Sequence, residues 1–177
     1  MEYVFLDLET TGLDPKVDKI LEVGILVLDG SLIERDSFRQ TIHFVSHVNG
    51  IPRPDVNEFV FKMHTKSKLW DATNNSYLDA SQVEARAIDF LSRHEPQPEM
   101  CGSTISFDRA FLKEQMPELE AKFDYHNLDV SSFRVLFNKL GMMTPEKVGA
   151  HRALADCRAS KNDLIFYMQE LGLLVTE

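Results

Sequence analysis

Residues 3–12 read YVFLDLETTG, and this stretch decides the fold. Its apolar beginning predicts a central β-strand from Tyr3 to Leu8. Residues two apart on a strand point to the same side of the sheet, so the carboxylates of Asp7 and Glu9 converge there. Two like charges at this spacing repel each other, and a bound cation is the usual remedy. The stretch therefore predicts a strand that ends at a metal site.

Three further residues with useful chemistry lie far along the chain. Alone, Asp108 is typical of an acid that complements the dipole at the start of a helix. His151 and Asp156 are five residues apart, which separates their side chains by about 140° on one regular helix. They can share a site only if His151 lies in the loop before the helix and Asp156 lies one turn inside it.

The five residues together supply four carboxylates and one imidazole. A strand-end acid such as Asp7 or Glu9 is by itself often only solvated, but an unpaired carboxylate beside a buried strand is costly, so the pair favours a function. Phosphodiester cleavage by two metal ions needs several hard oxygen ligands and a titratable base. A histidine with a pKa of about 6.5 is suited to accept a proton at neutral pH. The set therefore predicts a metal-dependent phosphodiester-cleaving site.

The composition is that of an ordinary globular protein, with 177 residues of which 44% are apolar and 27% charged. This length predicts one domain, residues 1–177. No apolar run is long enough to span a bilayer and no leader pattern opens the chain, so we expect a cytoplasmic protein without a membrane partner. Cys101 and Cys157 form no CxxC arrangement, so neither a disulfide framework nor a zinc site is indicated.

The formal net charge is -9, and the sequence has no run rich in Lys and Arg. Proteins that follow long nucleic acids neutralise many phosphates with clustered basic residues. A nucleic-acid substrate would therefore be gripped at few phosphates, largely through bound metal. Short substrates are favoured over long ones.

Hydrophobic patterns divide the chain into a strand-rich first half and a second half in which helices and short strands alternate. The predicted strands cover residues 3–8, 19–28, 31–45, 100–105 and 127–130, with a hairpin turn at Asp29-Gly30. The predicted helices cover residues 81–93, 106–117, 131–140 and 152–171, the first opened by a capping box of Ser81 with Glu84 and the second capped by Ser106. Residues 11–15, 50–54 and 141–145 are predicted loops. This order predicts an α/β fold with a mixed sheet.

Three motifs now resemble those of a known group. Asp7-x-Glu9, Asp108 after residues 102–107, and His151-x-Ala153-x-x-Asp156 resemble the exonuclease motifs of the DEDD superfamily, histidine subclass. Within it, the chain is most similar to oligoribonucleases. The similar segments are residues 6–15, 63–69, 108–119, 128–132 and 151–156. The resemblance implies a ribonuclease H-like mixed β-sheet flanked by helices.

The resemblance also implies an activity: 3′→5′ hydrolysis of short oligoribonucleotides to 5′-mononucleotides by a homodimer. It implies that Asp7, Glu9, Asp108 and Asp156 hold two Mg²⁺ or Mn²⁺ ions and that His151 is the general base. The implied substrate contacts are Thr10, Gly12, Leu13, His64, Trp70, Thr104, Tyr125 and Ser131, with Leu13 as an apolar wedge against a base. Ordinary packing explains Leu13 and Trp70 equally well.

Some positions depart from the oligoribonuclease pattern. Ser103 stands where the family usually has Asn, and His126 where it usually has Arg, which removes a permanent bidentate phosphate donor. Residues 138–149 lack the basic, Trp-containing pattern usual there. The strictness of a dinucleotide or RNA preference therefore stays open. Two alternatives remain: a DEDD exonuclease for DNA in proofreading or repair, and a non-catalytic binding module that keeps the fold.

Overall fold

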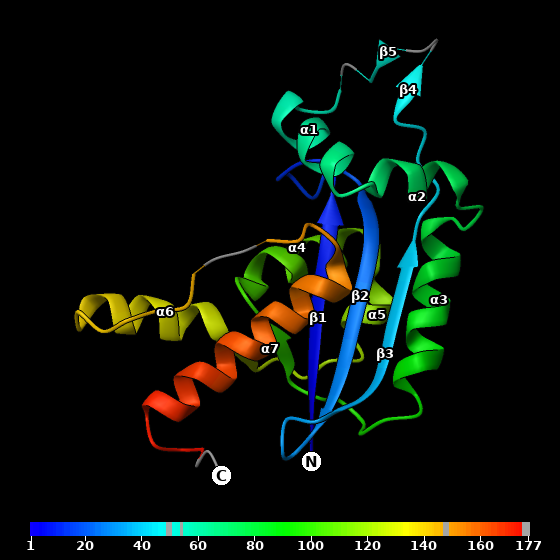
Figure 1. Cartoon of the computed structure of the whole chain (residues 1–177). Coiled ribbons are helices and arrows are strands. Elements are labelled where there is room, and N and C mark those ends of the chain that lie inside the picture. The colour runs from blue at the N-terminus through cyan, green and yellow to red at the C-terminus, as the bar shows by residue number, and fades with distance from the viewer. Residues whose placement is uncertain (49–50, 54, 147–148, 175–177) are drawn as a thin grey trace.

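The computed structural model describes residues 1–48, 51–53, 55–146 and 149–174, and within them five strands form a mixed sheet (Figure 1). The strands are β1 (Glu2–Thr10), β2 (Ile20–Asp29), β3 (Glu34–Thr41), β6 (Met100–Gly102) and β7 (Asn127–Asp129), in the order β3-β2-β1-β6-β7. β1 and β3 both run antiparallel to β2, whereas β6 lies parallel to β1 and β7 parallel to β6. The predicted mixed sheet is confirmed.

Helices cover both faces of this sheet. They are α1 (Glu58–Lys66), α2 (Leu69–Asn75), α3 (Ala80–Leu91), α4 (Ile105–Gln115), α5 (Pro117–Glu120), α6 (Val130–Lys139) and α7 (Ala153–Glu170). One core cluster joins β1 and β2 to α3, α4 and α5, and a second joins the opposite face to α6 and α7. A third, smaller cluster lies around α1 and α2. The flanked-sheet prediction is thus confirmed.

Side-chain alternation along β1 and β2 determines what faces α7. Phe5 and Leu26 belong to the α7 cluster, whereas Val4 and Val23 belong to the opposite one. Since every second residue shares a face, residues 7 and 9 of β1 and residues 22 and 24 of β2 also point toward α7. The sheet therefore presents polar residues to the first turn of α7.

The start of α7 packs unusually close to β2 at Gly24. A Cβ atom placed there would come within 2.5 Å of the Leu154 backbone nitrogen and 2.6 Å of the Ala153 carbonyl carbon. Only a residue without a side chain allows this approach, so Gly24 sets how close the helix comes to the sheet.

Several predicted boundaries were wrong. The third strand covers Glu34–Thr41 and the fourth covers Met100–Gly102, both shorter than predicted. The capping box of α3 is formed by Asp79 with Gln82, and Ser81 only donates to the Asp79 carboxylate. Similarly, α4 begins at Ile105 after Thr104, so Ser106 lies inside the helix. Side chains of similar chemistry compete for a cap, and the backbone turn decides between them.

Residues 47–75 differ most from the prediction. α1 and α2 were not predicted at all, and β4 (His47–Val48) pairs antiparallel with β5 (Ile51–Pro52). The predicted loop 50–54 therefore contains a short strand, and its residues 50 and 54 lie outside the described part. No helix within the described ranges is long and apolar enough to cross a membrane.

Candidate active site

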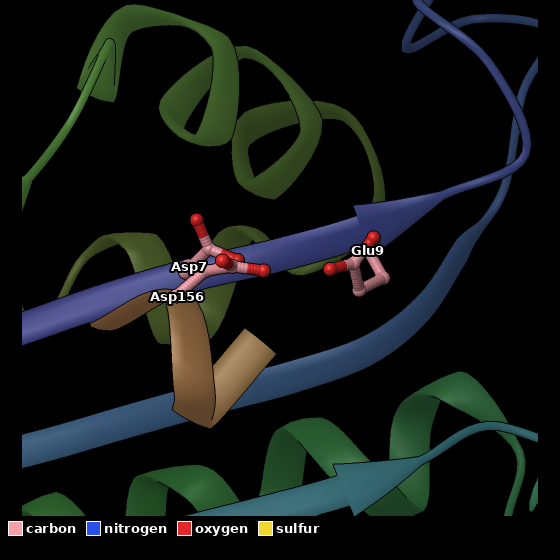
Figure 2. A group of neighbouring side chains, drawn as sticks. All are labelled: Asp7, Glu9 and Asp156. Carbon is pink, nitrogen blue, oxygen red and sulfur yellow. The ribbon is translucent and has the colours of Figure 1, made fainter. Parts of the chain in front are cut away.

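Three carboxylates meet between the end of β1 and the first turn of α7 (Figure 2). Asp7, Glu9 and Asp156 each offer an oxygen, and these atoms lie within 4.8 Å of one another. Asp7 and Glu9 converge because they alternate along β1, and Asp156 approaches from the helix that covers that face. The convergence predicted from their spacing is confirmed.

Asp108 reaches the same region from the first turn of α4. Its side chain is buried, and its Oδ1 accepts a hydrogen bond of 3.0 Å from the backbone N–H of Leu8. It lines the same cavity as the other three acids but lies outside their 4.8 Å group. One Asp108 oxygen therefore secures the strand, which leaves the other oxygen for a ligand.

His151 lies in the turn before α7, as the five-residue spacing required, with a φ of 53°. Asp156, one turn into the helix, bonds back to this turn. Its Oδ1 accepts from the N–H of Ala150 at 2.9 Å and its Oδ2 from the N–H of Arg152 at 3.0 Å. The Asp156 carboxylate thus holds the backbone on both sides of His151, which lines the same cavity as the acids.

Burial and mutual repulsion perturb the carboxylates strongly. Burial, followed by the nearby Asp108 and Glu9 charges, raises the pKa of Asp7 well above its ordinary value. Burial, with the Asp156 charge, raises the pKa of Glu9 to about 9, and burial raises that of Asp108 to about 7. Oxygen donors that repel one another in a buried site match the requirements of a hard divalent cation. The residues present therefore fit a metal centre.

A cavity of about 560 Å³ opens over this centre. The residues that line it include the four acids, His151, Leu13, Ser103, Thr104, Phe107, Glu146, Ser160 and Asp163. Among the described residues no Lys or Arg lines it. An acidic cavity of this kind attracts cations and repels a bare polyanion.

The sequence profile of the RNase T exonuclease family matches residues 4–162. The chain belongs to this family. It is 36% identical to the oligoribonuclease of Pseudoalteromonas atlantica over 174 residues, which cover 95% of this chain and 94% of that protein. It is also 36% identical to the oligoribonuclease of Nitrosomonas europaea, with the same coverage. The predicted superfamily and the exonuclease class are confirmed.

Solved exonuclease structures share the fold. Exonuclease I of E. coli, in complex with single-stranded DNA, superposes with a TM-score of 0.69 at 14% identity over 96% of this chain. Exonuclease I of Methylocaldum szegediense gives 0.71 at 16% identity. This chain spans about 40% of the length of those proteins. The predicted ribonuclease H-like fold is confirmed.

Leu13, the predicted apolar wedge against a base, lies on a loop held by several hydrogen bonds. Leu13 is 82% exposed at the edge of the cavity. The preceding turn is held by Thr10, whose hydroxyl donates to the Gly12 carbonyl at 2.6 Å, and by Asp18, which accepts from the N–H of Asp14 at 2.9 Å. A Cβ at Gly12 would lie 2.4 Å from the Asp18 carboxylate. Thr10 and Gly12 thus shape the loop that presents Leu13.

His64 and Trp70, two predicted substrate contacts, are buried outside the cavity. The Nε2–H of His64 donates to the Thr10 carbonyl at 2.9 Å, while its Nδ1 lies 3.8 Å from the Glu9 carboxylate. Burial lowers the pKa of His64. Trp70 packs edge-on against His64 and donates to the Phe61 carbonyl at 2.9 Å. The structure therefore places Trp70 in the packed interior, where it supports His64 behind Glu9.

Of the remaining predicted contacts, only Thr104 lines the cavity. Its φ is 62°, and its N–H donates to the Asp129 carboxylate at 3.0 Å. The Ser131 hydroxyl donates to the same carboxylate at 2.6 Å. Tyr125 is 79% exposed, and its ring lies tilted against that of His126 with centroids 3.8 Å apart. The structure therefore does not bring Tyr125 and Ser131 to the metal cluster of their own chain.

Two acidic residues that organise the site were missed from the sequence. Asp129 binds the starts of both α4 and α6, through Thr104, Ile105 and Ser131. Glu22 is wholly buried in β2 and bonds to the start of α7. A lone acid inside the apolar run ILEVGILVL was the available signal for Glu22. Its partners, about 130 residues away, gave no signal.

Proposed function

We propose that this chain is a metal-dependent 3′→5′ exoribonuclease that hydrolyses short oligoribonucleotides to 5′-mononucleotides. The observation that carries the proposal is the convergence of Asp7, Glu9 and Asp156 within 4.8 Å, with His151 on the adjoining turn. Family membership and the oligoribonuclease relatives support the reaction and the substrate class.

The metal ligands are Asp7, Glu9, Asp108 and Asp156, and the proposed complement is two Mg²⁺ or Mn²⁺ ions. Bound divalent ions stabilise the charge that develops on the phosphate during in-line displacement. The chain supplies the oxygens, holds them through the β1 backbone and α7, and keeps basic side chains of the described residues away from the cavity.

His151 is the proposed general base, which accepts the proton of the attacking water. Its ring lines the cavity, and its turn is anchored on both sides by the Asp156 carboxylate. A base needs to lie within hydrogen-bond reach of the water it activates, and the anchored turn keeps His151 among the residues that line the cavity. The other ring of this region, His64, is buried and lies outside the cavity.

Short RNA is the proposed substrate. The cavity is acidic, and the chain has a net charge of -9, so the phosphates must be held mainly through metal. Leu13 offers an exposed apolar surface on which a base packs, and Thr104 offers a polar contact. We further propose a cytoplasmic homodimer of one-domain protomers, in which Tyr125 and Ser131 contact the substrate bound by the partner subunit.

The test is hydrolysis of 5′-labelled RNA of two, five and twenty nucleotides, beside matched DNA, with Mn²⁺ and with chelator. Rapid Mn²⁺-dependent cleavage of the dinucleotide supports the proposal. Preference for DNA or for the longest RNA would contradict the proposal and indicate a general exonuclease instead. His151→Ala should lower kcat by orders of magnitude and leave Mn²⁺ binding intact, with exposed His43→Ala as the control. Unchanged turnover in His151→Ala contradicts its role as base.

A further inference from the structure

Glu22 is a charged side chain with no exposed surface, placed near the start of β2. Its side chain lies on the face of the sheet that α7 covers. It is two residues before Gly24, where α7 closely approaches the sheet. Burying a carboxylate is costly unless strong donors surround it. The groups that donate hydrogen bonds to the Glu22 carboxylate therefore show which part of the protein it holds in place.

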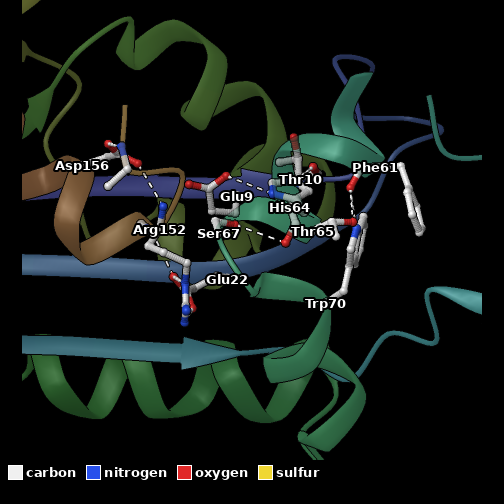
Figure 3. A network of polar contacts seen from close by, with 12 residues as sticks. Glu9, Thr10, Glu22, Phe61, His64, Thr65, Ser67, Trp70, Arg152 and Asp156 are labelled. Atoms are coloured by element: carbon white, nitrogen blue, oxygen red, sulfur yellow. Dashed lines mark hydrogen bonds and ion pairs between the residues drawn. The ribbon is translucent and has the colours of Figure 1, made fainter. Parts of the chain in front are cut away.

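Three donors bind this carboxylate, and all come from the start of α7; Figure 3 shows the Arg152 side chain beside Glu22. The Arg152 guanidinium binds both oxygens, with Nε to Oε1 at 3.1 Å and Nη2 to Oε2 at 2.7 Å. The backbone N–H of Ala153 donates to Oε1 at 3.0 Å. Charge-assisted, two-point contacts of this kind fix orientation as well as distance.

These contacts act on the turn that carries His151. Its φ of 53° lies in the left-handed region, which residues other than glycine adopt uncommonly and at a cost that surrounding contacts must offset. Asp156 holds the turn through the N–H groups of Ala150 and Arg152. Glu22 holds it through the Arg152 side chain and the Ala153 N–H. The turn is thus clamped between two carboxylates, one of them outside the metal cluster.

We infer that Glu22 is a positioning residue for catalysis: through Arg152 it keeps His151 and Asp156 in their working geometry. This inference rests on the proposed function. It also assigns Arg152 a role that its position beside His151 does not suggest, since its guanidinium is held by Glu22 instead of reaching for a phosphate.

A plain structural tether between sheet and helix is the competing explanation, and the chain contains a matched example. Glu34 binds Arg158, six residues further along α7, with distances of 3.1 Å and 2.7 Å. This pair has the same two-point geometry, but it is more exposed and bonds to no part of the His151 turn. Glu34→Gln therefore controls for the loss of a strand-to-helix ion pair.

The test compares wild type, Glu34→Gln, Glu22→Gln and the double variant Glu22→Gln with Arg152→Met. The double variant keeps an acceptor for the Ala153 N–H and leaves no buried unpaired charge. It should therefore fold even if the single variant Glu22→Gln does not. The measurements are kcat and KM for a dinucleotide with Mn²⁺, Mn²⁺ affinity by calorimetry, the melting temperature, and the backbone ¹³C shifts of His151 by NMR.

We expect kcat of the double variant to fall about 10- to 100-fold, as with other residues that orient metal ligands, with KM changed about threefold or less. The His151 shifts should leave their left-handed values, and Glu34→Gln should match wild type. Turnover within threefold of wild type, with unchanged His151 shifts, overturns the inference. If wild type itself cleaves nothing, the proposed function fails. The His151 shifts then decide alone whether Glu22 holds the turn.

Discussion

Glu9→Gln should stabilise the metal-free protein while abolishing its activity. The pKa of Glu9 is raised from 4.5 to about 9, chiefly by burial and then by the Asp156 charge. Between these values the folded protein binds a proton that the unfolded chain releases. The stability of the metal-free protein therefore falls as the pH rises from 4.5 to about 9. A glutamine carries no such proton and removes this penalty.

The size of the effect follows from the pH. A pH of about 7.5 lies about three units above the ordinary pKa of this side chain. At ~1.4 kcal/mol per unit, the free energy of unfolding is lowered by about 4 kcal/mol. At about pH 5.5 this decrease shrinks to about 1.4 kcal/mol. For a domain of this size, each kcal/mol moves the melting temperature by about 2 to 4 °C. The variant should thus melt roughly 8 to 16 °C higher near pH 7.5, and only a few degrees higher near pH 5.5.

The assay is thermal unfolding followed by circular dichroism, in chelator and in Mn²⁺, at both pH values. Wild type should gain stability from Mn²⁺ because the ion binds only the folded state, and the variant should gain much less. Glu114→Gln, which removes an exposed acid from α4, is the control for net charge. A variant less stable than wild type in chelator near pH 7.5 would refute the reasoning, because Glu9 would then stabilise the metal-free fold.

The other predictions concern the cavity edge, the packed aromatic cluster and the approach of α7. Leu13→Ala should raise KM for a dinucleotide about fivefold, the equivalent of ~1 kcal/mol of lost apolar contact, without changing the melting temperature. Trp70→Ala should cost about 3 to 5 kcal/mol in chemical denaturation, because the side chain is buried. Gly24→Ala should lower kcat about 10- to 100-fold, since its Cβ would meet the Leu154 nitrogen at 2.5 Å; unchanged kinetics would contradict this.

The central strands and the convergence of the acidic motifs could be predicted because their signals are local. The apolar run of β1 and the two-residue spacing of Asp7 and Glu9 contain the necessary information. The five-residue spacing of His151 and Asp156 likewise required a loop followed by a helix, which the structure has. Short-range geometry was sufficient for both.

α1 had a local start signal that the prediction did not use, the Asn57 cap whose side chain accepts from the Phe59 N–H, whereas α2 depends on tertiary packing. α2 starts after Lys68 in a left-handed turn without a side-chain cap, so no start signal is visible. Trp70 stacks between Phe44 and Phe61, with centroid distances of 5.8 and 5.6 Å. The resemblance suggested a nucleotide contact for Trp70, but neighbours distant in sequence place it in the interior.

The arrangement of charge explains how an acidic exonuclease-family protein can act on a polyanion. Arg152 stands next to the proposed base, where a free guanidinium would bind phosphate, yet Glu22 holds it. Arg134, near the same cavity, bonds to Asp163 and to the Pro145 carbonyl. Because both arginines are bound to other groups of the fold, they form no ion pairs with the four acids of the site. The negative charge of these acids therefore still requires a bound metal ion to balance it. In the proposed function, phosphate binding is therefore coupled to metal binding, and a substrate that offers only a few phosphates would lose least from the missing basic groove.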